Sequence, residues 1–264
     1  MDLDSRPDPS QSQAEAEVAE DLFTLENDYE IQSFTASPVI TVIVGPEKKI
    51  YKLHRKLLVE KSPFFDNCLN SRMKESFTNE VVLPEDSYRG FELVADWIYS
   101  EKVPYIEISG DQDDTTPGRY AYVLADKFCM PELQNALIDR LADYWTRQHI
   151  YAGTITEMAD LVDEDGALYR LMIDELAHDI VKHSWVYKPR SDSCSENERP
   201  SFSKDWDGEW RGSLEKLLAC PKSAWKLLWK VSVTKKADRD PAESPEKYHV
   251  SVDSKVGNSQ VPGA

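Results

Sequence analysis

The sequence lacks the long apolar segments of membrane and secreted proteins. Its apolar runs have the length of strands, whereas a helix needs roughly 20 apolar residues to cross a bilayer. The opening MDLDSRPDPS has no apolar core of a secretory signal and is too acidic for a transit peptide. We therefore expect an intracellular protein of the cytoplasm, the nucleus or both, without an integral membrane segment.

Cysteine is scarce, and its spacing fits no metal site. The four cysteines, Cys68, Cys129, Cys194 and Cys220, form no C-x-x-C pair, and none has a histidine at a zinc-like spacing. In an intracellular protein they are expected to be reduced thiols, with Cys68 and Cys129 buried as small hydrophobic side chains. The prediction is that no metal is bound.

The motifs of common enzymes are also missing. There is no G-x-S-x-G and no phosphate loop with Gly-Lys-Ser/Thr. His178 and His183 are five positions apart and lack the glutamate of an H-E-x-x-H zinc site. His54 has lysine, arginine and aromatic neighbours, so a structural role at a strand–helix junction is favoured over a general base. We predict that the protein is not an enzyme and has no cofactor or catalytic residue.

The charge is strongly one-sided. The chain has 48 acidic and 31 basic residues, which give a net charge of -17. Binding to nucleic acid depends on neutralising phosphates, so this balance argues against nucleic acid as a partner. With 264 residues, of which 41% are hydrophobic, the chain is long enough to bury a sizeable core.

The local patterns predict strands mixed with helices first and helices alone afterwards. The β-branched run VITVIV, Val39 to Val44, predicts a strand buried on both faces, with IYKL returning after GPEKK as the second strand of a hairpin. Ser62 followed by a proline is typical of a helix start. The predicted fold class is α+β, a small β-sheet flanked by α-helices and followed by an all-α C-terminal extension.

Composition divides the chain further. The expected parts are an acidic, mostly disordered segment over 1–35, the α+β domain over 36–147, a helical extension over 148–187, a polar linker over 188–205, a C-terminal helical patch over 206–234 and a disordered tail over 235–264.

Six short motifs in one order carry a family resemblance. They are the strand Ile40–Gly45, YKLHRKLL, SPFF, MKES, VVLPED and FELVADWIYS. This region resembles a BTB/POZ domain, particularly the short fungal type. The resemblance implies a protein-interaction module that docks on a scaffold or forms homodimers. The sequence departs from the family at Ser37–Val39, where many members have an aspartate associated with the dimer interface.

The resemblance implies one contact with a scaffold. Met73 and Glu75 form a hydrophobic-x-Glu triplet in the loop before a strand. In BTB adaptors the triplet at this place contacts the cullin scaffold of a ubiquitin ligase, and an exposed methionine is an adaptable apolar anchor. The alternative is an ordinary polar loop.

The resemblance also implies a dimer interface. In dimeric relatives the position that matches Leu57 faces the partner subunit, together with an N-terminal segment. Here Leu22, Phe23 and Phe34 could supply that segment. The alternative is that Leu57 belongs to the core of its own chain.

The stretch PKSAWKLLWKVSVTKK, Pro221 to Lys236, is basic and aromatic within an acidic chain. On a helix, Trp225, Leu228 and Trp229 share one face. Such a pattern can bind an anionic membrane, calmodulin or an acidic partner, and we expect a partner patch here. The favoured alternative is docking onto the acidic helices of its own chain.

Together these patterns predict a protein–protein interaction adaptor, with a possible role as a substrate receptor for a cullin ubiquitin ligase. The alternative is a homotypic regulatory scaffold without a ligase role.

Overall fold

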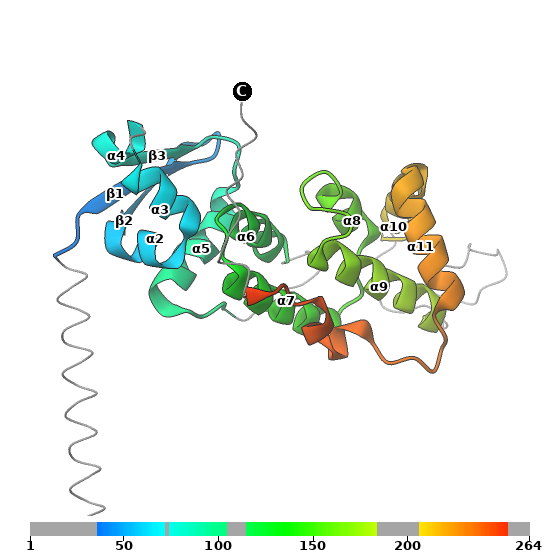
Figure 1. Ribbon diagram of the computed structural model, residues 1–264. Helices are drawn as coiled ribbons and strands as arrows, with labels where there is room; N and C mark the ends of the chain where they lie inside the picture. Colours follow the sequence, from blue (N-terminus) through cyan, green and yellow to red (C-terminus); the bar gives the residue numbers. More distant parts are fainter. Residues whose placement is uncertain (1–35, 72–73, 105–114, 184–205, 253–264) are drawn as a thin grey trace, which may run out of the picture.

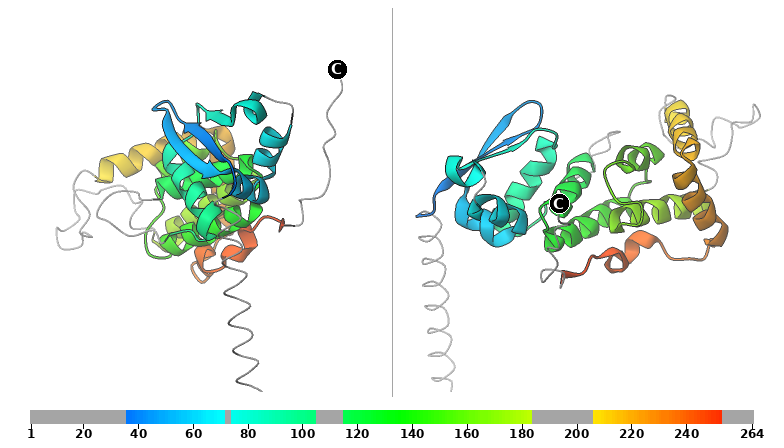
Figure 2. Two further views of the ribbon diagram at one scale, coloured as in Figure 1. Left: turned by 90° about the vertical axis from the view of Figure 1, so that its left-hand side faces the viewer. Right: turned by 45° about the horizontal axis from the view of Figure 1, so that its top comes forward.

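The structure, a computed structural model, describes residues 36–71, 74–104, 115–183 and 206–252. They form an elongated molecule, with a small sheet and its helices at one end and helices alone at the other (Figure 1, Figure 2). The α+β fold class with a helical C-terminal part is confirmed. Within these ranges no helix has the length and apolar character that crossing a membrane requires.

Three strands form the sheet, in the order β2-β1-β3. β1 (Val39–Val44) runs antiparallel to β2 (Lys49–His54), which confirms the predicted hairpin. In the turn between them Gly45 takes a φ of 78°, in the left-handed region that favours glycine. β1 also pairs in parallel with β3 (Glu80–Leu83). A parallel pair needs a crossover connection, and the helices between β2 and β3 supply it.

Only one face of the sheet is buried. Ile40, Val42 and Val44 point into the core, whereas Val39 is 49% exposed. The prediction that β1 is buried on both faces is wrong, because its outward side chains remain at the surface. The continuous apolar run therefore combines a core-facing row with an outward row that no described element covers completely.

Helices α2 (Arg55–Lys61) and α3 (Pro63–Asn70) follow β2. Ser62 caps α3, because its side chain accepts a hydrogen bond from the backbone N–H of Phe65 at 3.3 Å. The predicted helix start, with proline at the first position, is confirmed. Ser62 is buried, and its hydroxyl also donates to the carbonyl oxygen of Phe128 at 2.8 Å. The cap thus ties α3 to the end of a later helix.

Helices α5 to α11 share one core with the sheet. α5, α6 and α7 pack in sequence order, each against the next. The helical patch expected near the C-terminus consists of two helices, because a proline begins a new helix there. The bounds are α4 (Lys74–Thr78), α5 (Tyr88–Ser100), α6 (Thr116–Lys127), α7 (Pro131–Trp145), α8 (Ala152–Met158), α9 (Ala167–Lys182), α10 (Trp206–Ala219) and α11 (Pro221–Val233).

After α11 the chain folds back along α9 and α7 (Figure 1). This segment, residues 235–252, contains two short 3₁₀ helices, η2 (Pro241–Glu243) and η3 (Pro245–Tyr248), and we call it the C-terminal strap. The prediction of a disordered tail from residue 235 is therefore wrong for residues 235–252. Residues 253–264, like the acidic segment 1–35, lie outside the described residues.

The strap is ordered by a few specific contacts with distant residues, although its own sequence is polar. Tyr248 is buried, and its hydroxyl donates to Asp174 Oδ2 at 2.8 Å. The side-chain amide of Asn135 donates to the carbonyl oxygen of Val250 at 3.0 Å and accepts from its N–H at 2.7 Å. A polar segment can therefore be ordered here because distant residues satisfy its backbone and anchor its aromatic ring.

The cysteines differ in part from expectation. Cys68 is half-buried, but Cys129, which was expected to be buried, is exposed. Cys129 takes a φ of 57° at the turn between α6 and α7. That turn places its side chain at the surface, while the preceding Phe128 fills the core. Cys194 lies outside the described residues.

Candidate functional site

Of the predicted scaffold contact, Glu75 lies on a short helix rather than in a loop. Glu75 is half-buried on α4, and no residue of α4 is fully buried. Met73 lies outside the described residues. The same helix presents Phe77, which is 77% exposed, the highest value for a large apolar side chain in the described part of the chain. Sequence reasoning missed Phe77, although its place two residues after the triplet was visible.

Of the residues predicted for a dimer interface, only Leu57 lies in the described part of the chain. Leu57 is buried in the core of its own chain, as the alternative had it. Leu22, Phe23 and Phe34 lie outside the described residues.

A different apolar surface crosses the open face of the sheet. Ile43 on β1 is paired with Ile50 on β2 and with Val82 on β3. Ile50 and Val82 are both exposed, and Ile43 is partly so. Directly paired residues point to the same side of a sheet, so these three side chains form one row. We call it the apolar row of the sheet.

The predicted C-terminal patch is exposed. On α11, Trp225 is 70%, Leu228 58% and Trp229 61% exposed. The opposite side of α11 is packed, with Leu227 and Ser223 buried. We call the three exposed side chains the aromatic face of α11. The helix is thus amphipathic, with its large aromatic side chains on the outside.

The lysines of α11 dock it onto its own chain. Each of them pairs with a carboxylate of α9 or of the turn before it, as the alternative reading expected. The hydrogen bond from one lysine lowers the pKa of the Asp165 carboxyl. The pairs are Lys222–Glu164 at 2.9 Å, Lys226–Asp165 at 2.7 Å and Lys230–Asp174 at 2.7 Å.

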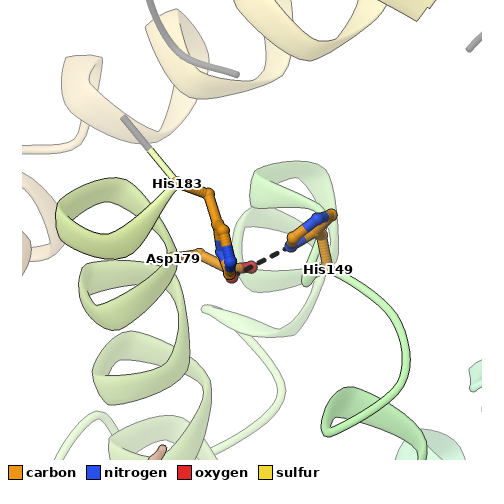
Figure 3. Close-up of side chains that lie close together, drawn as sticks. All are labelled: His149, Asp179 and His183. Carbon is orange, nitrogen blue, oxygen red and sulfur yellow. Dashed lines mark hydrogen bonds and ion pairs between the residues drawn. The ribbon is translucent and has the colours of Figure 1, made fainter. Parts of the chain in front are cut away.

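A cluster that the sequence did not predict joins the loop after α7 to the end of α9 (Figure 3). Asp179 Oδ1 lies 3.0 Å from His149 Nδ1 and 3.1 Å from His183 Nδ1. Asp179 Oδ2 accepts from the backbone N–H of Ile150 at 3.3 Å. The hydrogen bond to Asp179 raises the pKa of His149, against the opposing effect of burial.

Two imidazoles and a carboxylate are ligand types that zinc accepts. Here both ring nitrogens that face Asp179 already have it as a partner, so hydrogen bonding alone accounts for the geometry. The sequence could have revealed two members of this cluster, because Asp179 and His183 are four residues apart and so lie on one face of a helix. It could not reveal His149, which is 30 residues before Asp179 in the chain.

His54 occupies the predicted strand–helix junction, as the last residue of β2 and the cap of α2. Its Nδ1 lies 2.8 Å from the hydroxyl of Tyr99, and its backbone N–H donates to the same hydroxyl at 3.1 Å. These contacts tie the junction to α5. They give the histidine a structural role.

Comparison with known proteins agrees with this arrangement. No curated protein is similar enough to the chain to count as a match. Residues 18–143 match the family model described as BTB/POZ domain, a span that contains the sheet, helices α2 to α6 and most of α7. BTB domains are generally interaction modules rather than enzymes. The N-terminal region of this chain is therefore a BTB/POZ domain.

Proposed function

We propose that the protein is an intracellular adaptor that binds one partner through its BTB/POZ domain and a second through the aromatic face of α11. The observation that carries the proposal is the placement of the most exposed aromatic side chains of the described residues, Phe77, Trp225 and Trp229. Helix α4, which carries Phe77, lies at one end of the molecule, and helix α11, which carries the two tryptophans, lies at the other (Figure 1, Figure 2). Two partners can bind such distant surfaces without competing.

The proposed partner of the BTB/POZ domain is a cullin scaffold, which makes the chain a substrate receptor of a ubiquitin ligase. An exposed aromatic ring offers an apolar anchor, and a carboxylate on the same short helix offers an acceptor for a partner's donors. On α4 these groups are Phe77, which is exposed, and Glu75, which is half-buried. The six motifs in register support the short fungal type of domain.

The proposed partner of α11 is an apolar surface of a client protein. The lysines of α11 already pair with carboxylates of their own chain, so they do not select an acidic partner. What remains outward is the aromatic face, and tryptophan is enriched among residues that dominate binding energy. The client is therefore recognised by burial of tryptophan rings rather than by charge.

Binding of a purified cullin to the full chain tests the adaptor proposal. The variant with Met73→Ala, Glu75→Ala and Phe77→Ala is expected to weaken cullin binding at least tenfold, about 1.4 kcal/mol or more. The variant with Trp225→Ala and Trp229→Ala is the matched control, because it removes larger aromatic rings from the other end and leaves cullin affinity unchanged. Affinity can be measured by calorimetry. Equal affinity of both variants and the natural chain would remove the cullin role.

A second candidate function is homotypic assembly, and the apolar row of the sheet favours it. Exposed apolar side chains paired across three strands offer a self-complementary surface. Ile50→Lys is expected to convert a dimer into a monomer, because it would bury a charge in the contact. Lys52→Ala, on the same side of β2, is the control. Light scattering that finds the natural chain monomeric at all concentrations would exclude this function.

A further inference from the structure

Three polar side chains converge beneath the C-terminal strap. Glu175 and His178 come from α9, and Asp240 comes from the strap directly before η2. Their ligand atoms, one from each residue, all lie within 4.8 Å of one another. Glu175 and His178 are each only 2% exposed. None of the three belongs to the surfaces that the adaptor function uses.

The buried members of this cluster are not satisfied. Glu175 Oε2 and both ring nitrogens of His178 have no hydrogen-bond partner among the described residues. Buried side-chain polar atoms nearly always have one, so each exception needs an explanation such as a bound ion or water. Three orphan atoms in two neighbouring side chains therefore indicate that something is bound between them.

The ligand types favour an ion over a water molecule. Glu175 and Asp240 each offer a carboxylate oxygen, and His178 offers an imidazole nitrogen. A divalent cation would balance two carboxylates and supply a partner for the imidazole.

The spacing of the residues also suits a metal. Residues three apart on a helix lie on one face, and Glu-x-x-His at this spacing supplies metal ligands in helical carboxylate proteins. Asp240 is held in place as the N-cap of η2, because its Oδ1 accepts from the backbone N–H of Ala242 at 2.9 Å. One imidazole and two carboxylates suit zinc, manganese or iron.

We propose that Glu175, His178 and Asp240 form a binding site for a divalent transition-metal ion, which fastens the C-terminal strap to α9. Glu175 and His178 are fixed on one helix, so the ion must draw in Asp240 to complete the site. Metal binding and docking of the strap are therefore coupled, as they are wherever a site is assembled from separate parts of a chain.

The experiment uses the full chain, stripped of metal by a chelator and titrated with Zn²⁺ and, separately, with Mn²⁺. We expect one ion per chain, a rise in the unfolding midpoint, and slower hydrogen–deuterium exchange over residues 235–252. Glu175→Gln and Asp240→Asn keep the side-chain shape and are each expected to weaken binding at least tenfold. Both should remove the metal-dependent protection of the strap.

The matched control is the double variant His149→Gln and His183→Gln, which disables the other candidate cluster. It is expected to bind the ion at the strap as the natural chain does. Absence of binding to the natural chain would overturn the proposal. So would binding that survives both strap-site variants and disappears in the control. Should Glu175→Gln fail to fold, Asp240→Asn carries the test, because Asp240 is only partly buried.

Discussion

Replacement of Phe128 by alanine is expected to lower the free energy of unfolding by about 3–5 kcal/mol. Phe128 is fully buried where α6 ends. Its ring centroid lies 5.1 Å from that of Phe64, 4.9 Å from Phe65 and 6.3 Å from Phe91. The ring therefore joins α3, α5 and α6, and its removal leaves a cavity that rigid helices cannot fill. The natural partners would also lose their aromatic contacts.

The measurement is urea-induced unfolding, followed by fluorescence and circular dichroism to check that the transitions coincide. Phe77→Ala is the matched control. It is the same substitution at an exposed position, so its effect on stability should stay within about 0.5 kcal/mol. Similar losses in both variants would show that Phe128 does not sit at the junction of the three helices.

Replacement of Gly90 by alanine is expected to destabilise the protein by about 1–3 kcal/mol, although alanine is the better helix former. A Cβ at Gly90 would lie 2.7 Å from the carbonyl carbon of Tyr120 and 2.8 Å from the backbone nitrogen of Ala121. Backbone atoms cannot rotate away, so α5 and α6 would have to separate. This close approach is the reason that a glycine stands inside α5.

The same substitution at Gly212 in α10 is the control for this prediction. Apart from the backbone of α10 itself, no heavy atom of the described side chains and backbone lies within 4 Å of a Cβ built there, so alanine should stabilise the helix by about 0.5–1 kcal/mol. Opposite signs in thermal unfolding would establish the steric cause. A stabilising effect at both positions would contradict the close packing of α5 against α6.

Local signals account for what could be predicted from the sequence. The hairpin of β1 and β2 follows from two apolar runs around a turn, and the start of α3 follows from Ser62 and the proline after it. Each depends on residues that are neighbours in the chain. The register of the motifs likewise identified the BTB/POZ region before any geometry was known.

The features that could not be predicted depend on contacts between residues that are far apart in the sequence. Nothing near Val250 reveals that Asn135 will bind its backbone, and nothing near Asp240 reveals Glu175 and His178. The spacing of residues in the sequence does show that α11 has a basic face and an aromatic face. It does not show which face packs onto the rest of the protein, because the carboxylates that pair with the lysines lie on α9 and in the turn before it.

The strap also changes what counts as the folding unit. Helix α7 belongs mostly to the BTB/POZ match, yet η2 and η3 pack against it from the far end of the chain. Excision at the end of the match would cut α7 within its last turn and would remove the two 3₁₀ helices that pack against it. A piece that keeps the described contacts of this helix with the strap therefore runs at least to Val250, well past the end of the family match.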